Sequence, residues 1–337
     1  MNYQCSIPGK LYVAGEYGVV KGYHAIILPT KLHIHFDIRD HDTLMISSNQ
    51  WDSPIVYTEE MLKCEAIWEK ALKTTYRYLK ELHIQIKTTS IIINSELDQL
   101  DHKYGLGSSG AIVIGLIQSV LVFHDINLSS LQLYKLGVIA LKDDRDVSSY
   151  GDLACSAFDA PILYKKDITV DLNLPIHELV QMDWDELQIE VLQAQFDMMV
   201  IHTNESASSS KLVKALNEHV SKEEQLAIFS DIDPLVLSFL NEIMHDDKIK
   251  AFTMIKQIET KMKTLDERIG NLMYSNNINK VFEFAKRHGV TYKISGAGGG
   301  DNILLFLNSK KEYNDINKAL PKPFINITSF IKGVIYE

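Results

Sequence analysis

The segment that most constrains the fold is rich in glycine and lies directly before a long apolar run. It reads Lys103-Tyr-Gly-Leu-Gly-Ser-Ser-Gly110 and continues into apolar residues 111–123. Closely spaced glycines leave backbone N–H groups uncovered, and serines before an apolar run can cap the first turn of a helix. That first turn carries unpaired N–H donors and a partial positive charge, which attract phosphate oxygens. The segment therefore predicts an anion-binding loop at the start of a buried helix.

The spacing of Gly105, Gly107 and Gly110 also matches the dinucleotide-binding fingerprint, but its surroundings differ from a Rossmann turn. Such a turn follows a buried strand, whereas residues 96–103 are polar and acidic. Asp125 has a suitable spacing for the acid that binds a ribose, yet no apolar strand carries it. No Gly-Lys-Ser/Thr completes a Walker A loop, and the His-Arg-Asp and Asp-Phe-Gly motifs of protein kinases do not occur. A phosphate-binding loop of another kind is left.

The length and net charge of the chain limit the number of domains and the kinds of binding partner. A chain of 337 residues, 46% hydrophobic, is long enough for two domains with a large core. Its formal net charge of −10 argues against a nucleic-acid partner, because such binding needs basic surface. An acidic chain that binds a polyphosphate must place cations at the site itself. We therefore expect lysines beside the glycine-rich loops, together with a divalent metal ion.

Cysteine usage and hydropathy indicate the compartment. Cys5, Cys64 and Cys155 are widely spaced and form no Cys-x-x-Cys pair, which predicts free thiols in a reducing cytoplasm. The N-terminal residues lack the basic-then-apolar pattern of a signal peptide. The apolar run at 111–123 is too short to cross a bilayer. We therefore expect a cytoplasmic protein with no membrane partner.

Residues 4–20 predict two strands around a Pro-Gly turn. Apolar and polar residues alternate up to Pro8-Gly9-Lys10, and a second apolar stretch ends at Glu16 and Tyr17. Lys10 would then project just beyond the turn. Two interpretations stay open for this lysine: a surface position in a hairpin, which is the commoner case, or a cation held beside a binding site.

Further elements follow from periodicity. Residues 32–38 alternate as a half-buried strand with His33 and His35 on one face; without a third ligand at suitable spacing, we interpret both as exposed strand residues rather than metal ligands. Strands are also expected at 84–87 and 90–94. Helices are expected from apolar periodicity at residues 59–82, 128–141, 223–244, 249–273 and 279–288.

Residues 147–156 place polar residues and a glycine before a helix start made of small residues. Ser149 can act as the N-cap of that helix. Asp152 can act as an acid in its first turn, where the negative charge interacts favourably with the partial positive charge of the helix N-terminus. Capping is the commoner role for both residues, and catalysis is the alternative.

Composition shifts between residues 169 and 190, which predicts a domain boundary there and a division into residues 1–180 and 181–337. The second part opens with an apolar strand at 198–202, followed by the serine-rich turn 203–210 and a helix. A strand that leads through such a turn into a helix suits an anion, although serine turns without a ligand are commoner.

The segment from Ser295 to Asp301 has four glycines in five residues and lies between two predicted strands. A flexible hairpin is one interpretation, but ordinary hairpins use two glycines or fewer. So much glycine costs conformational entropy on folding. We therefore expect a ligand or another segment to approach this backbone closely.

Taken together and in this order, the loops resemble the motifs of the GHMP kinases, the superfamily of galactokinase, homoserine kinase and mevalonate kinase. The matching segments are 8–10 with 15–16, then 105–111, then 295–301. Finer features are similar to the bacterial phosphomevalonate kinases. They are Tyr17, where mevalonate kinases tend to have histidine, His102-Lys103-Tyr104 before the loop, Gly151-Asp152-Leu-Ala154 and Gly299-Gly300-Asp301.

The resemblance implies an α+β fold of two domains, a ribosomal-protein-S5-domain-2-like N-terminal half and a ferredoxin-like C-terminal half, with the active site between them. It implies ATP and Mg2+ as cofactors and phosphomevalonate as the small-molecule substrate, phosphorylated to the diphosphate, in a monomer or homodimer. Mevalonate kinase or another GHMP small-molecule kinase is the alternative, followed by a non-catalytic nucleotide or metabolite sensor.

The resemblance also implies roles for single residues. Lys10 and Asp152 would be catalytic, and Ser109 would lie near the metal, whose carboxylate ligand stays open. The residues expected to wrap the ATP phosphates are Gly105, Leu106, Gly107, Ser108, Ser109 and Gly110. Those expected to face substrate are Tyr17, Lys103, Ser149, Ser208, Ser209, Gly296, Ala297 and Gly298.

Two features depart from the family pattern. Residues 158–164 replace a strand that usually contains glycine and tryptophan, and Asn302 follows Asp301 where a small residue is common. Neither change falls in the phosphate loops, so both bear on the shape of the acceptor site.

Overall fold

The computed structural model describes residues 2–99, 102–144, 147–205 and 208–336. Its larger sheet has seven strands in the order β4-β3-β5-β2-β8-β9, with β1 paired to β2. The strands are β1 (Asn2–Ala14), β2 (His24–Asp40), β3 (Met45–Ser48), β4 (Ile55–Val56), β5 (Thr89–Ser95), β8 (Ile162–Lys165) and β9 (Gln188–Val191). Only β3 and β5 run parallel; the other pairs are antiparallel.

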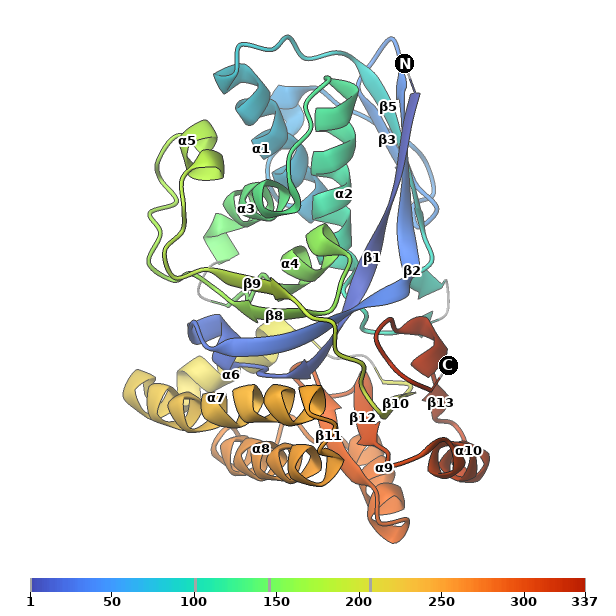
Figure 1. The fold of residues 1–337 in the computed structure, drawn as a ribbon. Helices are drawn as coiled ribbons and strands as arrows, with labels where there is room; N and C mark the ends of the chain where they lie inside the picture. The colour runs from blue at the N-terminus through green and yellow to red at the C-terminus, as the bar shows by residue number, and fades with distance from the viewer. Residues whose placement is uncertain (1, 100–101, 145–146, 206–207, 337) are drawn as a thin grey trace.

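Helices cover one face of this sheet (Figure 1). Two of them, α2 and α4, pack directly on β1 and β2, and the other three lie against these two or against one another. The helices are α1 (Ile67–Glu81), α2 (Ser108–Phe123), α3 (Ser130–Ala140), α4 (Gly151–Phe158) and α5 (Ile176–Gln181). Most of α2 is buried, as its apolar sequence predicts. Short elements connect them: η1 (Gly18–Lys21), η2 (Glu59–Met61), β6 (Asp98–Gln99), β7 (His102–Lys103) and η3 (Lys142–Asp144).

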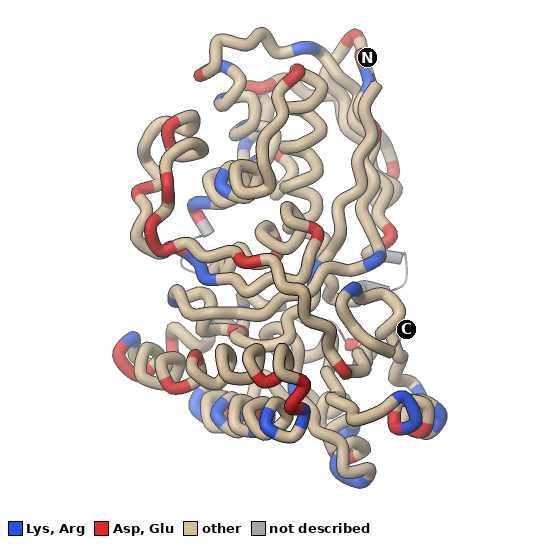
Figure 2. The backbone as a smooth tube through the Cα atoms, viewed as in Figure 1, with Lys and Arg blue, Asp and Glu red and all other residues tan. Residues whose placement is uncertain are grey.

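The second sheet is antiparallel, with the order β11-β12-β10-β13. Its strands are β10 (Met198–His202), β11 (Thr291–Ser295), β12 (Asn302–Phe306) and β13 (Ile325–Asn326). The helices around it are α6 (Ser209–His219), α7 (Lys222–Met244), α8 (Lys248–Arg268), α9 (Asn276–Arg287) and α10 (Lys310–Ala319), and η4 (Thr328–Phe330) follows β13. Helices α7 and α8 pack as a pair, and α8 and α9 cover β11. Charged residues of both signs lie along these outer helices (Figure 2).

Two sheets with segregated helices confirm the α+β class and the two-domain fold. The chain changes from one sheet to the other between β9 and β10, and the division at residue 180 stays a prediction. The C-terminal segment returns to the first sheet, where the Lys332 N–H donates to the Pro29 carbonyl at 2.9 Å. Among the described residues, no helix combines the length and apolarity needed to cross a membrane.

Several predicted elements need correction. The predicted turn at Pro8-Gly9-Lys10 is wrong, because β1 continues through it with a register shift between Pro8 and Lys10. The helix predicted from residue 59 begins only at Ile67, since Cys64 has a positive φ of 65°. Residues 84–87 form no strand; there the Lys87 N–H donates to the His124 ring at 2.9 Å. Other predicted elements agree with α3, β5, α7, α8 and α9 to within a few residues.

The predicted free cysteines and the predicted strand position of the two histidines agree with the structure. All three cysteines are free thiols. His33 and His35 are half-exposed on β2, and the His35 Nε2 lies 3.2 Å from a carboxylate oxygen of Glu96. No group of three or more His, Cys, Asp or Glu side chains in the described part of the chain could hold a metal ion unaided.

Candidate active site

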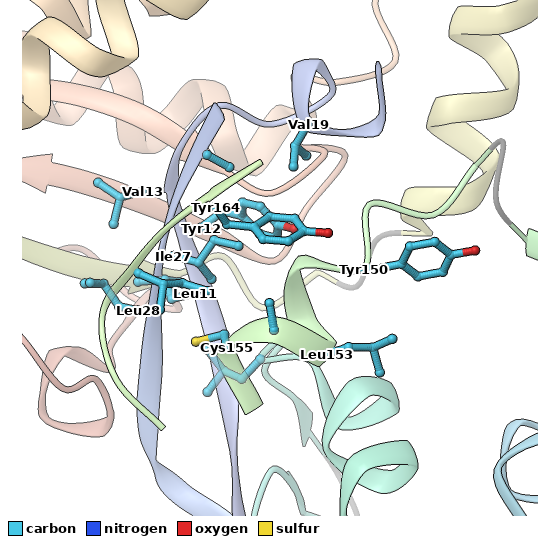
Figure 3. Close-up of a cluster of buried hydrophobic side chains, with 14 of the residues drawn as sticks. Leu11, Tyr12, Val13, Val19, Ile27, Leu28, Tyr150, Leu153, Cys155 and Tyr164 are labelled. Carbon is cyan, nitrogen blue, oxygen red and sulfur yellow. The ribbon is translucent and has the colours of Figure 1, made fainter. Parts of the chain in front are cut away.

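The predicted loops converge on one cavity of about 500 Å3. Its lining comes from both halves of the chain, so the residues predicted from separate motifs meet in space. The lining residues that carry polar chemistry are Lys10, Tyr12, Glu16, Tyr17, Ser108, Ser109, Ser148, Ser149, Asp152, Ser209, Ser210, Ser295, Asp301 and Asn302. Apolar residues of β1, β2 and α4 form one buried cluster, which also holds Tyr164 and the cavity residue Tyr12 (Figure 3).

The first glycine-rich loop ends at the N-terminus of α2. Gly107 is its N-cap residue, with φ of 80°, and no side chain caps this end of the helix. The predicted capping by serines is therefore wrong. Ser108 and Ser109 are instead the first two helical residues, and both line the cavity. An uncapped first turn that faces a cavity keeps its N–H donors available for an anion.

Lys10 is held against this loop by the irregular step in β1. Its backbone N–H donates to the Leu106 carbonyl at 2.7 Å instead of to β2. A Cβ at Gly9 would collide with that same carbonyl oxygen, so glycine is required before Lys10. The Lys10 side chain runs along Gly107, and its Nζ lies 3.4 Å from the Gly105 carbonyl. The surface interpretation of Lys10 is wrong, because the side chain is half-buried at the cavity.

Asp152 lies in the first turn of α4 and packs against the start of α2. A Cβ added to Gly110 would lie 2.8 Å from the Asp152 carboxyl carbon. Burial raises the pKa of Asp152 above its ordinary value, while the charge of Lys10 and backbone N–H groups, including those of Leu153 and Gly110, partly offset this rise. The carboxyl group and the Lys10 ammonium thus influence each other within one cavity.

Ser149 is not the N-cap of α4, which is Tyr150 with a φ of 57°. The Ser149 hydroxyl lies 2.7 Å from the Tyr12 hydroxyl and accepts from the Gly151 N–H at 3.3 Å. Its carbonyl accepts from Tyr164 at 2.8 Å. Burial, with a smaller contribution from Asp152, raises the pKa of Tyr12, so this phenol stays protonated. The serine is therefore fixed in place beside Asp152.

The second glycine-rich loop docks on the first half of the chain. The Tyr17 hydroxyl donates to the Ala297 carbonyl at 2.7 Å, and the Ser295 hydroxyl donates to the Tyr12 carbonyl at 2.7 Å. Asn302 donates to the Tyr104 carbonyl at 2.7 Å, which joins this loop to the one before α2. These contacts bring segments together across the whole length of the chain.

A buried ion pair supports the second loop. The Lys293 ammonium lies 2.6 Å from a carboxylate oxygen of Glu16, with side-chain exposures of 0% and 4%. The same oxygen accepts from the Gly296 N–H at 3.3 Å. Sequence reasoning missed Lys293, although a lysine within an otherwise apolar strand is a signal for a buried partner. Tyr12 was also missed, because nothing local distinguishes it, whereas Asp301 and Asn302 were noted in the glycine-rich motif without a role at the site.

Only some of the remaining residues predicted to face the substrate line the cavity. Ser209 lines the cavity, while Ser208 is the exposed N-cap residue of α6 and lies outside the cavity lining. Gly296 and Ala297 line it, whereas Gly298 packs against the Met273 carbonyl. Lys103 belongs to β7, but its side chain lies outside the described residues. The roles of these residues toward a substrate stay predictions.

The donor set fits a magnesium ion that accompanies a triphosphate. Mg2+ takes oxygen ligands and commonly binds through one or two carboxylates together with substrate phosphates. The Asp152 carboxylate and the Ser109 hydroxyl border the same cavity. If the ion binds here, these two residues would hold it, and Asp152 would supply the carboxylate that the sequence left open; this assignment stays a prediction.

Comparisons with known proteins agree with this geometry. Residues 67–160 match the model of the GHMP kinases N terminal domain. The chain is 26% identical over 334 residues to phosphomevalonate kinase of Streptomyces sp. (strain CL190), covering 90% of this chain and 89% of that protein. It is 24% identical over 335 residues to mevalonate kinase of Methanocaldococcus jannaschii, covering 95% and 96%. The solved structure of Streptococcus pneumoniae phosphomevalonate kinase in complex with phosphomevalonate and AMPPNP matches with a TM-score of 0.82 at 21% identity, covering 96% and 100%.

Proposed function

We propose that this chain, whose residues 67–160 match the GHMP kinases N terminal domain and whose fold matches that of a phosphomevalonate kinase, transfers a phosphoryl group from ATP to phosphomevalonate. The product would be diphosphomevalonate. The observation that carries the proposal is the cavity that joins Lys10 and Asp152 to the uncapped N-terminus of α2. Similarity to a Streptomyces phosphomevalonate kinase over 90% of the chain supports this acceptor.

The chemistry needs few groups from the protein. Phosphoryl transfer depends mainly on aligning donor and acceptor and on neutralising charge on oxygen. In our proposal the N–H groups of Gly107 to Ser109 bind phosphate oxygens, and Lys10 stabilises charge on the transferred group. Bound Mg2+ would neutralise the phosphates. Tyr17, Ser149 and Ser209 border the part of the cavity where we expect the acceptor.

The acceptor decides the role of Asp152. A phosphate monoester has a second pKa near 6 and is largely ionised at neutral pH, so no general base is required. Asp152 would then orient Lys10 or the metal ion. If the acceptor were an alcohol, as in a mevalonate kinase, Asp152 would take the proton, and a raised pKa suits that role. Mevalonate kinase is therefore the second candidate.

The test measures ADP release from MgATP with phosphomevalonate, mevalonate, homoserine and galactose as separate acceptors. We expect one ADP per phosphomevalonate consumed. Release with mevalonate alone would establish the second candidate. Release with none of the four above the background hydrolysis would contradict kinase activity toward these acceptors and favour a nucleotide or metabolite sensor.

Asp152→Asn separates the two mechanisms. With phosphomevalonate as acceptor we expect it to keep a measurable part of its turnover, whereas a loss of about three orders of magnitude or more would favour the base role. Lys10→Met is the matched control, because it should reduce turnover by about 100-fold or more with either acceptor.

A further inference from the structure

A second cavity, of about 230 Å3, shares two structural elements with the candidate active site. Helix α1 places Ile67 in the active-site lining and Lys70, Lys73 and Arg77 in the lining of the second cavity. Residues 139–142 contribute to both as well: Leu141 faces the first cavity, and its neighbours face the second. The two cavities are therefore adjacent and have a wall in common.

The second cavity is lined mainly by basic side chains, although the chain as a whole is acidic. Its lining includes four basic side chains, Lys70, Lys73, Arg77 and Lys142, and one acidic side chain, Asp143, in a protein of formal net charge −10. Three of these cations follow one face of α1 at spacings of three and four residues. Like charges at such spacings destabilise a helix, so an anion bound among them would relieve repulsion. We call this second cavity the basic cavity.

Three of these four basic side chains, Lys73, Arg77 and Lys142, have no charged partner among the described residues. The Lys73 ammonium donates to the Leu62 carbonyl at 2.9 Å, and the Lys142 ammonium lies 3.5 Å from the Asn173 side-chain oxygen. Both acceptors are uncharged. No ion pair or hydrogen bond of the Arg77 guanidinium occurs among the described residues. Lys73 and Arg77 are exposed at the cavity, so a ligand can reach them from solvent.

We propose that the basic cavity binds a small molecule bearing a phosphate or diphosphate group and that binding there changes turnover at the active site. Guanidinium and ammonium donors suit phosphate oxygens. The buried Thr74, Ile139 and Ile176 close the cavity behind them. Binding does not rest on the proposed acceptor, because it concerns a different set of residues.

A direct chain of contacts links the basic cavity to Asp152. Lys142 lines the basic cavity, and the preceding residue, Leu141, lines the active site. The Leu141 carbonyl accepts from the Tyr150 hydroxyl at 2.9 Å. Tyr150 is in turn the N-cap residue of α4, whose first turn carries Asp152. A shift of residues 139–142 on binding would therefore reach the catalytic carboxylate.

The first experiment titrates inorganic pyrophosphate calorimetrically into the full-length protein saturated with AMPPNP, which occupies the glycine-loop cavity. We expect one further equivalent to bind. The double variant Lys73→Ala/Arg77→Ala should bind it at least tenfold more weakly. A matched double variant, Lys256→Ala/Lys311→Ala, removes the same charge from exposed positions elsewhere and should bind as the wild type does. No binding to the saturated protein, or equal affinity in both double variants, would overturn the proposal.

Two further measurements keep the test decisive. Lys142→Gln changes a lining residue outside α1 and should also weaken pyrophosphate binding. This second variant tests the site even if the α1 double variant misfolds. Initial rates at fixed free Mg2+, with and without pyrophosphate, should differ in the wild type and not in Lys73→Ala/Arg77→Ala. Binding without any change of rate would disprove the coupling to the active site, and this outcome does not depend on which acceptor the enzyme uses.

Discussion

The loop of residues 104–110 and the loop of residues 295–301 border the same cavity, but the space around their glycines differs. In the first, Gly107 has a φ of 80°, and a Cβ there would lie 2.6 Å from Cγ of Lys10. In the second, Gly296 has a φ of 73°, and a Cβ there would meet no other atom within 4 Å. Glycine in the first loop thus allows the Lys10 side chain to approach, whereas Gly296 is needed only for its backbone angle.

The two loops are also supported differently. The first rests on the bulge in β1, where the Lys10 N–H bonds the Leu106 carbonyl. The second rests on side chains, namely the buried pair of Lys293 with Glu16 and the buried carboxyl group of Glu259, whose oxygen lies 3.4 Å from the Ile294 N–H. Backbone support tolerates side-chain changes, whereas a buried charge depends on its partner. The predictions that follow test this contrast.

The largest effect is expected from Lys293→Met. Removing the ammonium leaves the Glu16 carboxylate buried without a cation, which should lower the free energy of unfolding by about 3–5 kcal/mol in chemical denaturation. The double variant Glu16→Gln/Lys293→Met should recover most of this loss, because neither position 16 nor position 293 then carries a buried charge. Lys286→Met breaks an exposed pair with Glu283 and should leave the free energy of unfolding almost unchanged, because solvent screens this pair. A Lys293→Met variant no less stable than Lys286→Met would refute the side-chain support of the second loop.

Gly107→Ala should reduce turnover by about 100-fold, because the new methyl group displaces the Lys10 side chain from the phosphate loop. The measurement is kcat at saturating ATP and acceptor, with the native fold checked by circular dichroism. A variant that retains more than a tenth of wild-type turnover would show that Lys10 adapts and that the close approach is unimportant.

A pH-dependent contribution to stability is expected under the second loop. Burial raises the pKa of Glu259 from its ordinary 4.5 to about 7, against the opposing charges of Lys293 and Lys263. The folded state then holds a proton that the unfolded state has lost, so this group's contribution falls as pH rises from about 4.5 to about 7. Between about pH 5 and pH 7 the loss is about 2 kcal/mol.

Glu259→Gln tests that contribution. The variant cannot titrate at this position, so its free energy of unfolding should fall less than that of the wild type over the same pH interval. Urea denaturation of both proteins at each pH gives the difference directly. Parallel pH profiles would show that Glu259 is already ionised in the folded protein.

The smallest effect is expected from Gly296→Ala. The substitution meets no neighbouring atom and costs only the backbone strain of a positive φ, about 1–2 kcal/mol. Turnover should fall by less than about 30-fold, since a strain of about 1–2 kcal/mol is worth about a 5- to 30-fold change when all of it acts on the transition state. If Gly296→Ala impaired turnover as much as Gly107→Ala, the two loops would contribute in the same way and the contrast would fail.

Local chemistry was sufficient to predict the parts of this molecule that depend on neighbours in sequence. The apolar run after Gly110 specifies a buried helix, and the glycines before it specify an open backbone, whatever lies around them. Periodicity predicted α3 and α7 within one or two residues. The motif order, through its family resemblance, then pointed to Lys10 and Asp152, which the structure places at one cavity.

Only the tertiary structure decided features that join distant residues. Local sequence predicts a turn at Pro8-Gly9, yet pairing with the long β2 keeps the strand extended and converts the turn into a bulge. Ser149 could cap a helix, but it bonds Tyr12, which lies 137 residues away. Lys293 and Glu16 are 277 residues apart, and they pair because burying both charges without a partner would cost several kcal/mol. Propensity acts over a few residues, whereas burial and charge pairing act wherever the folded chain brings groups together.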